Sequence, residues 1–172
     1  SRSATGSLRA RLNRKLLARR TGASAPQYLR ALERDPSLSD AQIDTFYAVL
    51  RRHVSRIVTQ RITSRIDFFV VDMASASRCR RDQSRKYLVD LLANLSGTHD
   101  DVAADWIIRA ATRSGAGSTA AAAFVREVAL RAGKIFAQRG ITTSEKLIKR
   151  GRKKSGLDKD EAYALIGALL GL

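Results

Sequence analysis

The sequence predicts an all-α fold, a single helical-bundle-like domain of about six to eight helices with one long central helix and a basic N-terminal arm. Apolar residues recur at intervals of three and four along nearly the whole chain, which is the period of a helix with one buried face. The two prolines, Pro26 and Pro36, lie near the N-terminus, so none interrupts the later helices. With 172 residues, of which 44% are hydrophobic, the chain can bury the core of one domain.

Residues 1–23 are expected to form the basic arm or a first helix, and residues 24–172 the helical domain. The arm is rich in Arg and contains no acid, and its leucines share one helical face: Leu8, Leu12 and Leu16. An organelle transit peptide has the same composition, so this alternative stays open. Ser24 followed by Pro26 predicts the N-cap and first turn of a short helix.

The longest periodic stretch predicts the long central helix, from about residue 40 to residue 75. Ser39 and Gln42 form a capping box at its start, and the apolar positions after it stay on one helical face. The segment 68–71 is rich in residues that favour strands, so a break at this segment is the alternative.

Three more helices are expected between residues 78 and 140. The first carries a face of leucines and ends at Ser96-Gly97, and the second begins with Thr98 and Asp101 as its cap. The third follows a glycine turn, with Ser118 as its N-cap, and ends at Gly140 as its C-cap residue. That turn is no Walker A loop, because no Lys precedes Ser118.

Two short helices are expected at the C-terminus. The first is basic and covers residues 143–150, and a loop from Gly151 to Gly156 follows it. Asp158 and Glu161 then cap a terminal helix with an apolar face, which must pack on the domain or on a partner.

The charge of the chain indicates the class of its partner. Lys and Arg number 32 against 16 Asp and Glu, which gives a net charge of +16. So much like charge opposes compaction, whereas phosphates neutralise it and release their counterions. We therefore expect a nucleic-acid-binding protein. Duplex DNA is favoured over structured RNA, because aromatic residues make up only 6% and fall on core faces, where they cannot stack on unpaired bases.

Three clusters of basic residues are the candidate nucleic-acid-binding residues. The arm contributes Arg9, Arg11, Arg14, Lys15, Arg19 and Arg20. The second cluster consists of Arg78, Arg80, Arg81, Arg85 and Lys86. The third and densest cluster consists of Lys146, Lys149, Arg150, Arg152, Lys153 and Lys154.

The spacing inside the clusters suggests how each would meet phosphate. Arg78, Arg81 and Arg85 are three and four residues apart, which predicts three guanidinium groups on one side of a helix. The third cluster follows a helix and a turn at Gly140-Ile141, an outline that loosely matches a helix-turn-helix. A solvated helix face is the alternative for the second cluster, and a non-specific phosphate contact is the alternative to a groove-reading helix for the third.

No catalytic constellation is visible, so we expect neither enzymatic activity nor a cofactor. Positive neighbours favour the thiolate form of Cys79, but no His lies near it in the sequence. His99, Asp100, Asp101 and Asp105 resemble a cation site, yet acids at a helix N-terminus usually serve as caps. We expect no metal.

Two other functions stay open. One is a helical protein-interaction module, such as a ribonucleoprotein or ribosomal subunit, an adaptor or a secreted effector domain, which would dock through the arm and the apolar C-terminal helix. The other is attachment of the arm to anionic lipid. No apolar run is long enough to span a membrane. We expect an intracellular protein, cytoplasmic or associated with the nucleoid or nucleus, or in an organelle if the arm is a transit peptide.

Overall fold

The computed structural model describes residues 29, 30, 32, 35–97 and 101–172. These residues form seven helices and no strand, so the prediction of an all-α domain is confirmed. The helices are α3 (Asp40–Gln60), α4 (Asp67–Ser77), α5 (Arg81–Ser96), α6 (Asp101–Ser114), α7 (Ser118–Ala137), α8 (Ser144–Ser155) and α9 (Lys159–Leu169). The predicted arm and the caps predicted at Ser24 and Thr98 lie outside the described residues.

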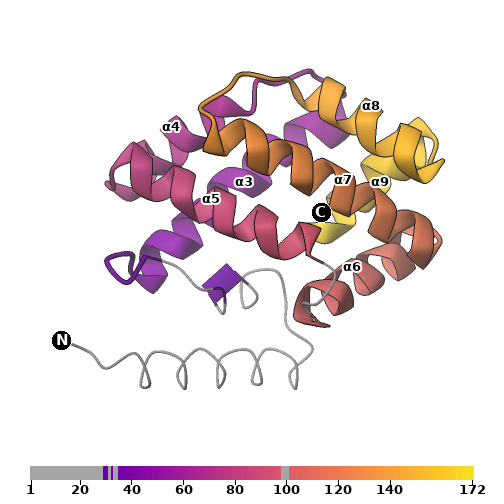
Figure 1. Ribbon diagram of the computed structural model, residues 1–172, viewed down its shortest axis with the longest axis horizontal. Coiled ribbons are helices and arrows are strands. Elements are labelled where there is room, and N and C mark those ends of the chain that lie inside the picture. Colours follow the sequence, from indigo (N-terminus) through magenta and orange to yellow (C-terminus); the bar gives the residue numbers. More distant parts are fainter. Residues whose placement is uncertain (1–28, 31, 33–34, 98–100) are drawn as a thin grey trace.

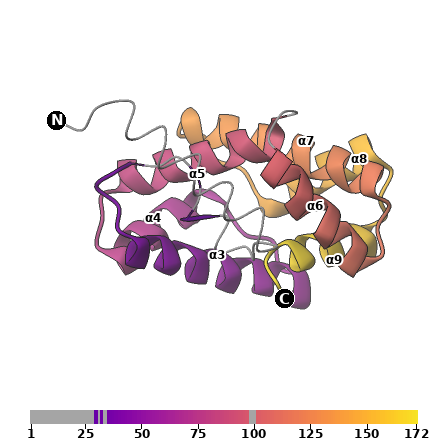
Figure 2. The same ribbon diagram turned by 90° about the horizontal axis from the view of Figure 1, so that it is seen from below.

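The helices form two layers (Figures 1 and 2). Helices α5, α7 and α8 lie side by side in one layer, with α7 in the middle. Helices α3 and α9 lie on the opposite side of the molecule, as Figure 2 shows. The apolar faces of both layers meet in one core, in which Phe46, Tyr87 and Phe124 are fully buried.

The long helix predicted over residues 40–75 is two helices, and the break lies before the segment where we considered one. Helix α3 ends at Gln60, and its C-cap residue Arg61 has a φ of 55°, which places its backbone in the left-handed region. The chain then turns into α4, which begins at Asp67. The apolar pattern continues across the break because the apolar faces of both helices pack into the same core.

A contact with a distant connector stabilises this break. The N–H of Ile66 donates to the carbonyl of Thr142 at 3.2 Å, and the N–H of Ser144 donates to the carbonyl of Ser64 at 2.8 Å. Segments 61–66 and 138–143 are thus joined by a short antiparallel bridge. Residues 62, 63 and 66 are β-branched, which suits this extended pairing better than a helix interior.

Both capping boxes predicted within the described residues are confirmed. The N–H of Gln42 donates to Ser39 Oγ at 3.1 Å, and the N–H of Ser39 donates to Gln42 Oε1 at 2.8 Å. Asp158 and Glu161 make the same reciprocal pair of hydrogen bonds at the start of α9. A cap of this kind stabilises a helix by about 1 kcal/mol.

Three predicted helix boundaries are wrong. Helix α7 begins after Gly117, which is its N-cap in place of Ser118, and ends at Ala137. Its C-cap residue is Gln138 in place of Gly140, and Arg139 takes a positive φ of 53°. Helix α8 passes through Gly151 and ends only at Gly156, whose φ is 77°. A glycine in a helix can serve close packing, and this role of Gly151 is described below.

The apolar C-terminal helix packs on the domain itself. Tyr163 and Leu165 are buried in the core. Side chains from α3 and α6 donate to the last carbonyls of α9: Trp106 Nε1 to Leu169 at 2.9 Å, Arg113 to Ala168 at 2.7 Å and the Tyr47 hydroxyl to Leu170 at 2.7 Å. The apolar face of α9 is therefore used within the chain. In the described part of the chain, no helix has the length and apolar character needed to cross a membrane.

Candidate nucleic-acid interface

Close packing on α7 fixes the position of α8. Gly151 is buried on α8, and a Cβ atom at this residue would stand 2.7 Å from ring carbons of Phe124 and from a methyl of Val128. No other residue type leaves room for so close an approach. Leu147 and Ile148 are buried on the same side of α8. The opposite side of α8 is therefore directed to solvent along its whole length.

The helix-turn-helix that we considered for α7 and α8 is not formed. Gly151, near the end of α8, packs against Phe124, near the start of α7. The two helices are thus antiparallel neighbours in one layer, as Figure 1 shows. The helices of a helix-turn-helix cross at about 90–120°, which leaves the second helix free to enter a groove. Here α8 forms part of a helical hairpin instead.

The outward side of α8 carries the third basic cluster. Its exposed members are Lys146, Lys149, Arg150, Lys153 and Lys154. Arg152 is half-buried, and its Nε donates to the carbonyl of Leu157 at 3.3 Å, so it holds the turn after the helix. The one acid of α8, Glu145, accepts a hydrogen bond from Thr63 at 3.0 Å.

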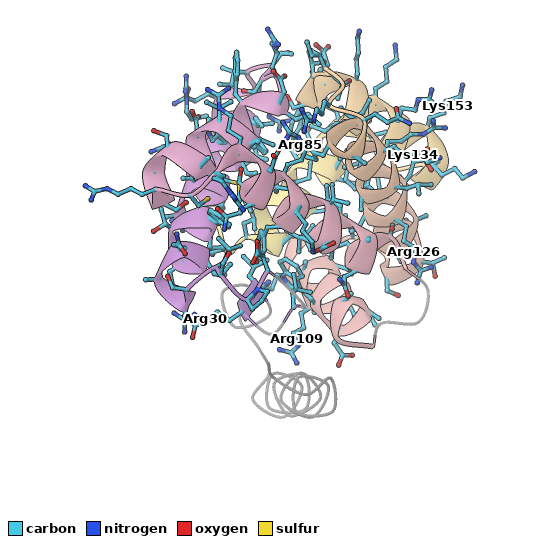
Figure 3. All side chains as sticks on the ribbon, turned by 60° about the vertical axis from the view of Figure 1, so that its left-hand side comes forward. Arg30, Arg85, Arg109, Arg126, Lys134 and Lys153 are labelled. Carbon is cyan, nitrogen blue, oxygen red and sulfur yellow. The ribbon has the colours of Figure 1, made fainter. Side chains whose placement is uncertain are left out.

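Helix α7 adds Lys134 to this surface, a residue that the sequence did not single out. Figure 3 shows Lys134, Lys153 and Arg126 along one edge of the molecule, with Arg30 and Arg109 elsewhere. Arg131 of α7 is paired with Glu127 at 3.2 Å and is not counted here. The surface is called the α7–α8 basic face below and consists of Lys134, Lys146, Lys149, Arg150, Lys153 and Lys154.

The cations of this face have no carboxylate partner in the part of the chain that the structure describes. Helix α8 has 12 residues and is therefore about 18 Å long. Its five exposed cations give about one positive charge per 3.6 Å. One strand of duplex DNA carries one phosphate per about 3.4 Å. The linear charge density of α8 thus matches that of a nucleic-acid strand.

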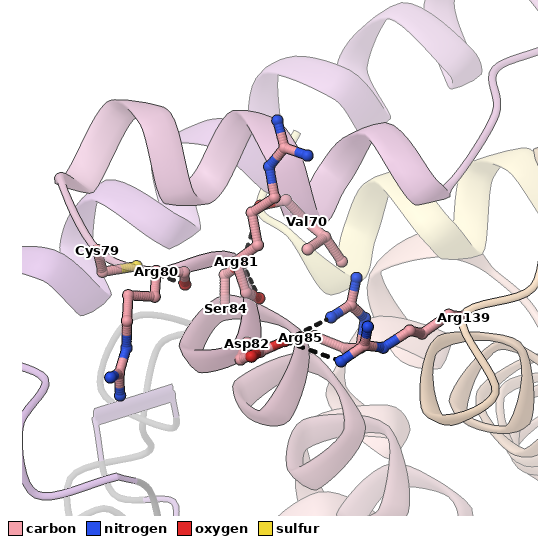
Figure 4. A network of polar contacts seen from close by, with 8 residues as sticks. All are labelled: Val70, Cys79, Arg80, Arg81, Asp82, Ser84, Arg85 and Arg139. Atoms are coloured by element: carbon pink, nitrogen blue, oxygen red, sulfur yellow. Dashed lines mark hydrogen bonds and ion pairs between the residues drawn. The ribbon is translucent and has the colours of Figure 1, made fainter.

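The second basic cluster does not form the predicted stripe. Arg78 ends α4 with a φ of 55° and does not belong to α5. Arg80 is the N-cap of α5, and Arg81 is its first residue. Figure 4 shows Arg80 and Arg81 pointing away from each other. The predicted arrangement of Arg78, Arg81 and Arg85 on one side of a helix is therefore wrong, because a left-handed residue separates the two helices.

Carboxylates form ion pairs with two cations of the second cluster, Arg85 and Lys86. Asp82 accepts from Arg85 at 3.0 Å and from Arg139 at 3.2 Å, as Figure 4 shows. Lys86 is paired with Asp90 at 2.8 Å. The cluster also lies at the other end of the molecule from the end of α8 (Figure 1). The structure thus keeps the second cluster and the third apart, and the arm cluster lies outside the described residues.

Cys79, His53 and Arg61 each have a partner within the described residues. Cys79 Sγ lies 3.3 Å from the Ser77 hydroxyl, which donates to it. His53 contacts Asp72 at 2.6 Å. Arg61 pairs with Asp160 at 2.9 Å and lies 4.0 Å above the ring of Tyr163.

No metal-binding group of three or more His, Cys, Asp or Glu side chains occurs among the described residues, which do not include His99 and Asp100. Comparison with known proteins yields no match to a family model, a curated protein or a solved structure. The surface chemistry described above is therefore the basis for a functional assignment.

Proposed function

We propose that this protein binds nucleic acid, with duplex DNA favoured, through phosphate contacts along the α7–α8 basic face. The observation that carries this proposal is the row of six cations without a carboxylate partner among the described residues, on one face of a hairpin that buried packing holds rigid. The charge density along α8 is close to that of one phosphate strand of a duplex. We assign no chemical reaction to the chain.

A purely structural explanation accounts for only part of this charge. Cations in the last turn of a helix interact favourably with its dipole, by about 0.3–1 kcal/mol each, which covers Lys153 and Lys154. Lys146, Lys149 and Arg150 lie earlier in α8. Each of them has another cation four residues away, and such a pair costs about 0.2–0.5 kcal/mol. A bound polyanion offsets the repulsion that remains in water.

The arrangement favours contacts to phosphates over contacts to bases. Helix α8 lies within its layer, so its side chains reach out from a broad surface and not from a projecting helix. Phe68 is the one aromatic residue among the large apolar side chains that the structure shows as exposed, and it lies on α4, against Arg65. We therefore expect little preference between sequences and no base stacking.

The salt dependence of binding tests this proposal. Six neutralised phosphates give a slope of log K against log salt of about −5, which weakens binding about 1000-fold between 50 and 200 mM salt. We expect this slope for two unrelated 20-bp DNA duplexes in fluorescence anisotropy, with weaker binding to single-stranded DNA. Duplex RNA in the same assay decides between DNA and RNA. Affinity weaker than micromolar for every nucleic acid at low salt would refute the proposal.

A specific observation also favours the protein-interaction alternative. Leu130 of α7 is 43% exposed and Ile141, on the connector before α8, is 66% exposed. A surface that combines apolar and basic side chains suits an acidic partner with apolar anchors. The variant Leu130→Ser separates the two functions. It should leave the binding of DNA unchanged, because phosphates make no apolar contact, whereas it should weaken binding to a protein partner.

A further inference from the structure

An apolar cavity of about 210 Å³, which is only partly enclosed, lies in the core between the two helical layers. All seven described helices contribute side chains to its lining, and α7 contributes the most. Phe124 and Phe136 form part of the wall on α7, and the two buried alanines Ala129 and Ala132 stand between them. Protein interiors are normally packed as densely as organic crystals, so a space of this size among buried apolar side chains is a candidate ligand site.

The cavity offers no site for water. Two lining side chains carry a polar atom, and both have partners in the protein. Ser144 Oγ accepts from the N–H of Ser64 at 3.0 Å, and Trp106 Nε1 donates to the carbonyl of Leu169 at 2.9 Å. A buried water needs two to four polar partners, and a cavity lined by Leu, Ile and Phe stays dry. A charged molecule would find no counter-charge.

We propose that this cavity is a binding site for a small, uncharged apolar molecule. A dry cavity of about 150 Å³ in another protein binds benzene. A cavity of 210 Å³ is larger by about two fifths, which suits a molecule of about eight to ten non-hydrogen atoms. The ligand class is therefore a substituted monocyclic aromatic or a hydrocarbon of similar size. This site is separate from the α7–α8 basic face, on the inner side of the same helices.

The last turn of α9 is the expected route of access. Most lining side chains are buried, and six are half-buried. Three of the six lie together at the end of α9, namely Ile166, Leu169 and Leu170, whereas Val54, Leu92 and Val128 lie on three different helices. Hydrogen bonds from Trp106 and Tyr47 hold this turn by its carbonyls. Opening of one helical turn is a smaller change than separation of the two layers.

Toluene is the probe for a test, with benzylammonium as a charged control of similar shape. We expect toluene at ten times its Kd to raise the Tm of the full chain by about 3 °C or more, and benzylammonium to leave the Tm unchanged. Chemical-shift changes in methyl NMR spectra should fall on residues of the lining. The absence of a Tm shift together with the absence of methyl shift changes at saturating toluene would overturn the proposal.

A variant that fills the cavity, compared with a control that makes the same change elsewhere on α7, tests the position of the site. Ala132→Leu places three more carbon atoms in the void, and Ala137→Leu makes the same change on the exposed end of α7. Toluene should stabilise the wild type and Ala137→Leu but not Ala132→Leu. An equal Tm shift in all three proteins would mean that toluene binds outside this cavity, which would refute the proposed site. If Ala132→Leu does not fold, Ala129→Val fills a smaller part of the same void and should weaken binding instead of abolishing it.

Discussion

Replacing Gly151 by Ala tests the close packing that positions the α7–α8 basic face. The new Cβ would stand 2.7 Å from Phe124 and Val128, which is closer than real carbon contacts allow. Phe124 is 1% exposed and cannot move away, so α8 must shift outward. Overpacking of this kind costs about 1–3 kcal/mol.

Gly133 provides the matched control, because it also lies inside a helix of the same layer. A Cβ on Gly133 would lie 3.5 Å from Leu92 Cβ, which is an ordinary contact. Both substitutions gain helix propensity, by about 1 kcal/mol. Gly133→Ala should therefore stabilise the protein, and Gly151→Ala should destabilise it by up to about 2 kcal/mol. Both variants gain the same helix propensity, so this gain cancels when their free energies of unfolding are subtracted. The remaining difference is the cost of overpacking at residue 151.

Urea unfolding followed by far-UV circular dichroism measures this difference. We expect a gap of about 1–3 kcal/mol in the free energy of unfolding, or about 2–12 °C in Tm for a chain of this length. Equal stabilisation by both substitutions would refute the packing of α8 on α7 described here, and with it the position of the basic face.

Three further predictions follow from individual contacts. Glu127→Gln removes the carboxylate paired with Arg131 beside the basic face, so we expect a steeper salt slope for DNA, by about 0.9, and a loss of stability below about 1 kcal/mol. The hydrogen bond that Asp158 accepts from the Glu161 N–H lowers the pKa of Asp158. Because the unfolded chain then binds more protons, this stabilisation is complete above about pH 4 and is lost as the pH falls further. Asp158→Asn keeps the cap and should make urea unfolding less dependent on pH below 4, and an unchanged dependence would contradict this assignment. Arg14→Gln with Lys15→Gln tests the arm, and we expect the salt slope to fall by up to about 1.8. An unchanged slope would remove the arm from the interface.

Signals in the local sequence predicted much of the fold. The capping boxes at Ser39 and Asp158 were predicted correctly because a cap depends on residues three positions apart. The break at residues 61–66 was missed because its stabilising partner, the connector at 138–143, is distant in sequence. The full length of α8 was missed for a related reason. Gly151 was interpreted as a helix breaker, and only the packing on Phe124 reveals its role.

The candidate site was predicted in part. The cations of α8 were identified from their density, since a charged helix face needs no tertiary information. Lys134 was missed because α7 was analysed for its buried positions alone. Arg78 is separated from Arg81 because Arg78 itself has a left-handed backbone. The sequence gives no sign of this, since Gly and Asn are the residues that usually take this conformation. The pairing of Asp82 with Arg139 joins residues 57 positions apart, so the sequence could not show that it neutralises part of the second cluster.

The most direct test of the proposed function compares two double variants that remove the same charge. Lys149→Gln with Lys153→Gln removes two cations from the α7–α8 basic face, and Arg52→Gln with Arg56→Gln removes two exposed cations from α3, on the opposite side of the molecule. Both pairs lie four residues apart on a helix. We predict that the first variant reduces the salt slope for duplex DNA by about 1.8 and weakens binding, while the second leaves the slope unchanged. Equal effects of the two variants would contradict a localised interface and would assign binding to the net charge alone.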